Sequence, residues 1–266
     1  MVGESVVPVI NQQPSPPETT PAIELRDVAL AGIGEGSGLR GLDLTVAPGE
    51  ILGVAGVAGN GQRELADLIA GALAPDRGEI VVGGKSMTGS GPKAFRRAGV
   101  VNVVGDPVRD FVVPGLSVGE HAALWGSMTS RRRLRFDVGA AATAITADAD
   151  RSGLDIVAPT RRLALLSGGN IQRVLLTLAF SEDATVLVVS YPTRGLDVRT
   201  TETTRSLLLA ARDAGRAVVL ISEDLDELLA LSDRIAVLAH GRCTGVVERR
   251  STDRRALGHL MTADAA

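Results

Sequence analysis

The sequence predicts an α/β fold in which a mostly parallel sheet is covered by helices on both faces. Short, continuously apolar runs such as residues 51–55 are typical of strands that are buried on both faces. Between such runs, apolar residues recur at helical spacing, as they do from Leu65 to Leu73. Strands and helices that alternate in this way predict a sheet between two helical layers. Because 45% of the 266 residues are hydrophobic, the chain can form a sizeable core.

Each expected element follows from its own pattern of apolar residues. Alternation predicts half-buried strands, continuous apolar runs predict fully buried strands, and recurrence once per helical turn predicts helices. Strands are expected at 23–28, 42–46, 51–55, 79–82, 185–189, 217–221 and 235–238. Helices are expected after residue 61 and near 118–127, 140–151, 171–178, 200–213 and 224–231. A hairpin and a last helix are expected to close the chain.

The chain is predicted to comprise a tail and one domain. The segment 1–21 is rich in Pro, Thr and Glu, which predicts disorder, and 22–266 is predicted to be the domain. Within it, residues from about 92 to 165 have the pattern of an inserted, mostly helical subdomain. An arginine cluster lies between two of its helices, formed by Arg131, Arg132, Arg133 and Arg135. This cluster is either a solvated surface or a contact with lipid headgroups or a partner protein.

Composition excludes some classes of protein. The net charge of −3 argues against a general nucleic-acid-binding protein, since such proteins usually present a basic face. The one cysteine, Cys243, excludes an intramolecular disulfide and fits a reducing compartment. No apolar run approaches the roughly 18 residues of a membrane span, and the N-terminus has no secretory signal pattern. A cytoplasmic protein that reaches a membrane only through a partner is therefore expected.

A glycine-rich loop stands between the buried strand 51–55 and the helix that follows. Its residues are Gly56, Val57, Ala58, Gly59, Asn60 and Gly61. Glycines let backbone N–H groups approach a phosphate, and the N-terminus of the following helix adds a positive dipole. The segment therefore predicts a phosphate cradle, and the alternative is a glycine-rich turn with only a packing role.

A second motif, Leu-Ser-Gly-Gly-Asn at 166–170, stands at the head of a predicted helix. An apolar strand follows and leads into Pro-Thr-Arg-Gly-Leu-Asp at 192–197. In this order and spacing, the segments resemble the ATP-binding-cassette (ABC) family over about residues 23–261. With residues 221–228, they look like the second, C-terminal cassette of the two-cassette ATPases of simple-sugar and nucleoside importers. The resemblance implies an ABC-type P-loop NTPase: a RecA-like core with an antiparallel β edge and the helical subdomain.

The glycine loop departs from that of an active ABC ATPase at its end. The alignment puts Gln62 where the phosphate-binding lysine belongs, and Arg63 where a Mg²⁺-binding serine or threonine belongs. A hydrogen bond to a charged group is worth roughly 1.5–3 kcal/mol, so the loss of the lysine predicts ATP binding about 10- to 100-fold weaker. The family's adenine-stacking tyrosine is absent at 29–31, and its glutamine near Mg²⁺ has only Asp106 as an equivalent.

Three further positions lack the family's catalytic groups. Ser190 replaces the aspartate that holds Mg²⁺, Tyr191 replaces the glutamate that acts as general base, and Glu223 replaces the switch histidine. A positioned base contributes about 10²–10⁴-fold in rate, and tyrosine, with a pKa of about 10, is a poor substitute. The resemblance therefore implies that the chain's own nucleotide site has no catalytic residues and binds no metal. Alternatively, Glu223 is an acid favoured by the dipole of a helix N-terminus.

The residues that the family uses across a dimer of cassettes are retained. They are Ser167, Gly168, Gly169, Asn170 and Asp197. The resemblance implies that the helix N-terminus at Ser167 binds the γ-phosphate held by a partner's loop, and that Asp197 acts at the same interface. Ser167 would cap its helix in any case, and the alternative for Asp197 is a plain turn residue.

These features predict an ATP-binding-type subunit of an ABC importer for a sugar or nucleoside. ATP is expected to bind weakly or through the partner's site, with Mg²⁺ only at that site. The expected partners are a second ABC cassette, in a hetero- or homodimer, and integral membrane permease subunits, without nucleic acid. The expected location is the cytoplasm, peripherally on the inner face of the cell membrane. The alternatives are a non-catalytic regulatory or scaffold protein and a soluble ABC ATPase.

Overall fold

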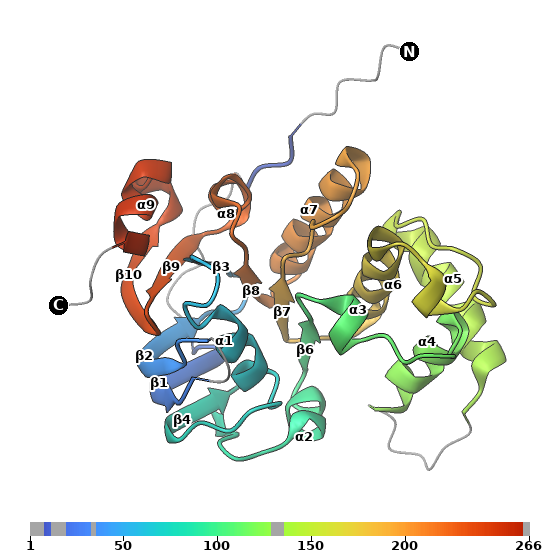
Figure 1. Ribbon diagram of the computed structural model, residues 1–266, viewed down its shortest axis with the longest axis horizontal. Coiled ribbons are helices and arrows are strands. Elements are labelled where there is room, and N and C mark those ends of the chain that lie inside the picture. Colours follow the sequence, from blue (N-terminus) through green and yellow to red (C-terminus); the bar gives the residue numbers. More distant parts are fainter. Residues whose placement is uncertain (1–7, 12–19, 33–35, 129–135, 263–266) are drawn as a thin grey trace. The chain divides into compact units, whose positions relative to one another are not determined.

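Figure 1 shows the computed structural model of the chain, which describes residues 8–11, 20–32, 36–128 and 136–262. The chain divides into two compact units. The larger unit comprises residues 10–102, 184–191 and 208–266, and the smaller unit comprises residues 1–9, 103–183 and 192–207. Among the described residues, the helices are too short or too polar to cross a membrane.

The elements begin and end as follows. The strands are β1 (Ile23–Leu30), β2 (Leu39–Val46), β3 (Ile51–Gly56), β4 (Arg77–Val82), β5 (Lys85–Ser86), β6 (Val100–Val103), β7 (Val186–Ser190), β8 (Ala217–Ile221), β9 (Arg234–Ala239) and β10 (Arg242–Glu248). The α-helices are α1 (Gln62–Ile69), α2 (Pro92–Arg97), α3 (Pro107–Asp110), α4 (Val118–Ser127), α5 (Val138–Ser152), α6 (Gly168–Ser181), α7 (Val198–Asp213), α8 (Leu225–Leu231) and α9 (Arg254–Thr262). Short 3₁₀ helices are η1 (Leu163–Leu165) and η2 (Arg249–Ser251).

Two sheets build the larger unit. One has the order β2-β1-β4-β5 and is antiparallel, and the other has the order β10-β9-β3-β8-β7-β6. In the second sheet β9, β3, β8 and β7 are parallel, and β10 is antiparallel to β9. Every residue of β3, β7 and β8 is buried, as expected of strands covered on both faces. The predicted α/β fold with an antiparallel β edge is confirmed.

The register of the parallel strands places the predicted site residues at one edge of the sheet. β3 lies between β8 and β9, with Gly53 opposite Leu220 on one side and Ile235 on the other. β7 ends at Ser190, which lies opposite Ile221 at the end of β8. The carboxyl ends of parallel strands lie at the same edge of a sheet. The glycine loop after β3 and the residues after β7 and β8 therefore all begin at that edge.

The smaller unit is mostly helical, with α3 to α6 gathered together in Figure 1. Helix α6 packs against α3, α4 and α5. Helix α4 begins with a capping box, in which Ser117 accepts from the Glu120 amide and the Glu120 carboxylate accepts from the Ser117 amide. Asp137 caps α5 with a single bond, in which its side chain accepts from the Ala140 amide.

The boundaries of the helical region differ from the predicted 92–165. Residues 92–102 belong to the larger unit, because Phe95 and Val100 are buried in its core at 2% and 4% exposure. In the other direction the smaller unit extends through α6 and also takes residues 192–207. The apolar pattern of α2 and β6 did not reveal with which core they pack. The arginine cluster at 131–135 lies outside the described residues.

The predicted disordered tail is wrong at one described residue. Asn11 is only 3% exposed, and its amide donates to the Ala230 carbonyl at 2.7 Å. Its side-chain Nδ2 donates to the Leu231 carbonyl at 3.1 Å and to Asp233 Oδ1 at 3.0 Å. Most of the remaining tail lies outside the described residues. A polar residue in a Pro-rich segment gave no sign of this buried anchoring.

Candidate functional site

The glycine loop joins the central strand β3 to α1 and has a backbone that only glycine adopts readily. Gly59 and Gly61 have φ values of 87° and 105°, in the left-handed region. A Cβ at Gly61 would lie 2.7 Å from the carbonyl oxygen of Gly38. The last glycine before Gln62 is therefore required both by its backbone angle and by the close approach of another segment.

Neighbouring segments of the larger unit brace the loop through hydrogen bonds. The Gly59 carbonyl accepts from the Ser37 amide at 2.9 Å, and the Asn60 carbonyl accepts from the Gly241 amide at 3.2 Å. The Asn60 side chain donates to the Leu238 carbonyl at 3.4 Å and accepts from the His240 amide at 3.3 Å. Asn60 thus fixes the loop from outside, a role that the motif alone did not reveal.

Gln62 folds back over the loop in which it stands. Its side chain is 3% exposed, and Nε2 donates to the Val57 carbonyl at 3.1 Å. The same nitrogen lies 2.4 Å from the position that a Cβ on Gly56 would take. The loop therefore holds a neutral amide against its first glycine, and that amide donates to the loop's own backbone.

Arg63, at the predicted Mg²⁺ position, lies along its own helix. Its side chain is 56% exposed, and Nε lies 3.6 Å from the Asp67 carboxylate one turn further along α1. A guanidinium has no lone pair for a metal ion. This position therefore supplies surface charge and no metal ligand.

The residues that the sequence predicts to replace the Mg²⁺ aspartate, the base and the switch histidine lie at the ends of β7 and β8. Ser190 is buried at 5% exposure, and the Tyr191 amide donates to the Ile221 carbonyl at 2.8 Å. Tyr191 has a φ of 51°, which is uncommon for a residue other than glycine. Its hydroxyl donates to the Glu223 carboxylate over a long 3.4 Å, so the substitutes for base and switch contact each other.

The donor set of this loop does not fit Mg²⁺. Magnesium is usually bound through one or two carboxylates together with waters and phosphate oxygens in octahedral geometry, whereas the positions in question carry Arg63, Ser190 and Tyr191, none of which has a carboxylate. The loop also lacks a cation for the phosphates, and its Gln62 amide already donates to Val57. The fit to a hydrolysing ATP site therefore fails, although the helix N-terminus of α1 keeps its positive dipole.

Residues 29–31 and Asp106, at the predicted adenine and glutamine positions, have structural contacts. Residues 29–31 offer no aromatic ring, and the Ala31 amide donates to Asp76 Oδ2 at 2.7 Å. Asp106, the nearest equivalent of the family's glutamine, caps the short helix α3 by accepting from the Arg109 amide at 3.2 Å. Asp106 belongs to the smaller unit, whereas the glycine loop belongs to the larger one.

The Leu-Ser-Gly-Gly-Asn motif forms an exposed helix N-terminus in the smaller unit. Ser167 caps α6, and its hydroxyl oxygen accepts from the Asn170 amide at 3.4 Å and from Asn170 Nδ2 at 3.0 Å. Both Ser167 and Gly168 are exposed, and a Cβ at Gly168 would meet no atom within 4 Å. This helix N-terminus is therefore open to an anion.

Asp197 lies just before α7, in the same unit as the motif. Its Oδ1 accepts from the Thr200 amide at 2.9 Å and its Oδ2 accepts from the Thr200 hydroxyl at 2.8 Å. These bonds, and an ion pair with Arg173, lower the pKa of Asp197 to about 2. Sequence reasoning did not identify Arg173, because only the fold brings it next to Asp197.

The fold and the order of the two motifs along the chain were compared with known families. The profile of the ABC transporter family matches residues 39–194, more than half of the chain. The chain therefore belongs to the ABC transporter family.

Solved structures of ATP-binding cassettes agree on the fold. A dimeric cassette in a post-hydrolysis state, bound to ADP and Pi, superposes with a TM-score of 0.74 at 20% identity, over 86% of this chain and 99% of that one. A nucleotide-free cassette superposes with a TM-score of 0.72 at 18% identity, over 92% of this chain and 100% of that one. At these identities the likeness establishes the fold alone.

Curated relatives are importer proteins that are longer than this chain. A glucose import ATP-binding protein of Haloferax volcanii is 37% identical over 98% of this chain and 48% of its own length. A nucleoside import ATP-binding protein of Lactococcus lactis subsp. cremoris is 34% identical over 98% of this chain and 52% of its own. A ribose import ATP-binding protein of Rubrobacter xylanophilus is 35% identical over 99% of this chain and 52% of its own length. The chain thus spans about half the length of these relatives.

Proposed function

We propose that this chain is an ATP-binding-type subunit of an ABC importer for a sugar or nucleoside, acting as the degenerate, second-type cassette of a pair. It completes the ATP site of a partner cassette through Ser167–Asn170 and does not hydrolyse ATP at its own loop. The observation that carries the proposal is the contrast between a loop whose Gln62 amide is bonded to the loop's own backbone and an exposed helix N-terminus at Gly168. The names of the similar proteins support an import role.

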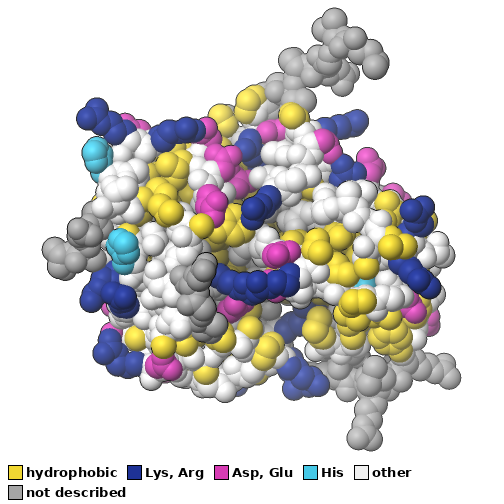
Figure 2. Space-filling view, viewed as in Figure 1, with side chains coloured by type: hydrophobic (Ala, Val, Ile, Leu, Met, Phe, Trp, Pro, Cys, Tyr) yellow, Lys and Arg dark blue, Asp and Glu magenta, His cyan; other side chains and the backbone are white. Residues whose placement is uncertain are grey.

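Exposed apolar side chains beside the motif support a partner on this side of the smaller unit. Leu165, directly before the motif, is 75% exposed, and Val198, directly after Asp197, is 68% exposed. Figure 2 shows many exposed hydrophobic side chains over the region of α3 to α6. Where exposed apolar side chains gather into a large patch, they mark an interaction surface. On this proposal the partners are a catalytically complete cassette and membrane permease subunits, at the inner face of the membrane.

Calorimetric titration of ATP, with and without Mg²⁺, tests the state of the chain's own loop. We expect weak binding that Mg²⁺ does not strengthen, and no ATP hydrolysis by the chain alone. Clear Mg²⁺-dependent hydrolysis that Tyr191→Phe abolishes would contradict the proposal and would favour a soluble ABC ATPase.

Association tests the remaining part of the proposal. The tagged chain is expected to co-purify with integral membrane subunits and with a second cassette, and the complex is expected to hydrolyse ATP. Isolation without any membrane subunit would instead favour a regulatory or scaffold protein that keeps the fold.

A further inference from the structure

One face of α6 contacts the segment 192–197 through three of its residues. Gly169, Gln172 and Arg173 stand at spacings of three and four residues, so they share one face of the helix. The segment that they contact leads from β7 into α7 and ends at Asp197. All of these residues belong to the smaller unit, so the contacts lie within one compact body.

Gly169 and Gln172 hold the backbone of this segment. A Cβ on Gly169 would lie 2.7 Å from the Gly195 carbonyl oxygen, so the second glycine of the motif permits a close backbone approach. Gln172 is 3% exposed, and its Nε2 donates to the Pro192 carbonyl at 3.1 Å. A buried amide bonded to a backbone carbonyl fixes the start of the segment, because leaving either group unpaired is costly.

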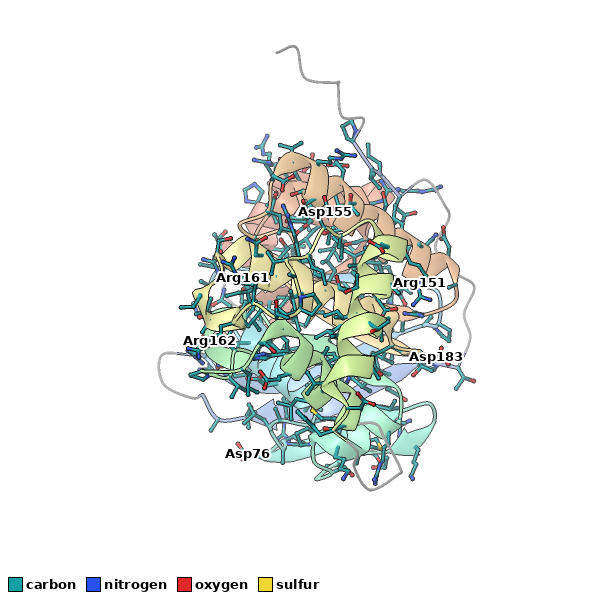
Figure 3. All side chains as sticks on the ribbon, turned by 90° about the vertical axis from the view of Figure 1, so that its right-hand side faces the viewer. Asp76, Arg151, Asp155, Arg161, Arg162 and Asp183 are labelled. Atoms are coloured by element: carbon teal, nitrogen blue, oxygen red, sulfur yellow. The ribbon has the colours of Figure 1, made fainter. Side chains whose placement is uncertain are left out.

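Arg173 contacts the other end of the segment and a third stretch of chain. One terminal nitrogen donates to Asp197 Oδ2, and the other donates to the main-chain carbonyl of Asp155 at 3.4 Å. Asp155, labelled in Figure 3, lies in the stretch that leads from α5 towards the motif. The Arg173 side chain is 23% exposed and the Asp197 side chain 52%. A guanidinium presents donors in a rigid planar fork, so it can bond two separate acceptors at once.

We infer that Arg173 is a positioning residue, which fixes Asp197 relative to the N-terminus of α6 so that both reach a partner cassette as one rigid element. The inference rests on the proposed function, since it concerns how this chain completes a partner's site. Partly exposed ion pairs contribute little to stability, so the effect of Arg173 is on geometry. A misplacement of about 1 Å at a catalytic centre can cost about 100-fold in rate, so such a brace affects turnover without affecting folding.

Hydrogen exchange on the isolated chain tests the brace without any partner. We expect Arg173→Ala to speed amide exchange across residues 192–200 and to leave the thermal unfolding midpoint nearly unchanged. Arg173→Lys is expected to give an intermediate rate, because an ammonium keeps the charge without the fork. The matched control is Arg151→Ala, at a residue labelled in Figure 3. It removes the ion pair with Asp148 on α5 of the same unit and should leave this segment unchanged. Equal exchange in Arg173→Ala and the unsubstituted chain would overturn the inference.

Turnover of the assembled importer tests its consequence. We expect Arg173→Ala to lower the kcat for ATP hydrolysis about tenfold, with little change in KM, since ATP is bound by the partner's loop. Gly168→Asp distinguishes a failure of the positioning role of Arg173 from a failure of the proposed function. If Gly168→Asp abolishes turnover and Arg173→Ala does not change it, the positioning role is wrong. If Gly168→Asp has no effect, the proposed function is wrong, and hydrogen exchange alone decides whether the brace exists.

Discussion

The glycine loop of the larger unit and the Ser167 motif of the smaller unit both form a helix N-terminus, with glycines before the helix at the loop and at its first two positions in the motif, but they differ in what surrounds them. At the glycine loop, Gln62 donates to the Val57 carbonyl, and Asn60 is bonded to residues near the end of β9. At the motif, Ser167 and Gly168 are exposed, and no atom approaches within 4 Å of a Cβ at Gly168. The helix dipole favours an anion at both places. What distinguishes the glycine loop is that Gln62, which stands at the predicted lysine position, is neutral and already donates to the loop's own backbone.

The largest expected effect comes from blocking the open N-terminus. Gly168→Asp adds a negative charge where the proposal places a partner's γ-phosphate, so we expect a loss of about 100-fold or more in kcat of the assembled importer. The substitution fills open space and should leave folding unchanged. Gly258→Asp on α9, where a Cβ also meets no atom within 4 Å, is the matched control and should hydrolyse ATP normally.

For stability, the larger effect is expected at the glycine loop and the smaller one at the Ser167 motif. Gly61→Ala places a Cβ 2.7 Å from the Gly38 carbonyl oxygen at a φ of 105°, so we expect the free energy of unfolding to fall by about 2 kcal/mol. Gly168→Ala has no such contact and should change it by less than about 0.5 kcal/mol. Urea unfolding of both variants provides the measurement. Equal losses would show that the loop is not under the backbone constraint described.

Restoring the cation tests whether Gln62 alone weakens the loop. We expect Gln62→Lys to raise ATP affinity about tenfold, because a charge-assisted hydrogen bond replaces a neutral amide. Hydrolysis should not appear, since Ser190 and Tyr191 still stand at the metal and base positions. Calorimetry measures the gain, and Gln62→Met, of similar size but without a charge, should show none. An ATPase activity in Gln62→Lys would mean that the substitutions after β7 do not prevent catalysis.

Acid is expected to release the contacts of Asp197 in a defined range. The Thr200 amide and hydroxyl, followed by Arg173, lower the pKa of Asp197 to about 2. Because the pKa in the folded chain lies below that of the unfolded chain, the stabilisation is complete above about pH 4 and is lost as the pH falls through about 2. Titration of the carboxyl carbon by NMR measures the pKa, and Arg173→Ala should raise it. A pKa near 4 in the unsubstituted chain would contradict the observed contacts.

The smallest effect is expected at the substituted base. Tyr191→Phe removes a long hydrogen bond to the exposed Glu223, so stability should change by less than about 0.5 kcal/mol. ATP hydrolysis by the assembled importer should stay as it is, because Tyr191 stands at the site proposed to be inactive. A marked fall in turnover would assign Tyr191 a role at the catalytic site.

The sequence alone determined the strands buried on both faces and the two motifs, and it predicts the missing catalytic groups. Continuous apolar runs identified β3, β7 and β8, because strands buried on both faces have no polar alternation. The absence of lysine at Gln62 and of carboxylates at Ser190 and Tyr191 could be read directly, since these conclusions depend only on which functional groups are present.

The tertiary structure alone decided what those side chains do. Gln62 could have extended outward, yet it bonds to Val57, and Asn11 could have been disordered, yet it is buried beside Asp233. Arg173 carries no motif of its own, and it meets Asp197 only because α6 and the segment after β7 pack together. The contacts of Asn11 and Arg173 join residues far apart in the chain, whereas sequence patterns report local periodicity and residue chemistry. Which groups meet is therefore set by packing.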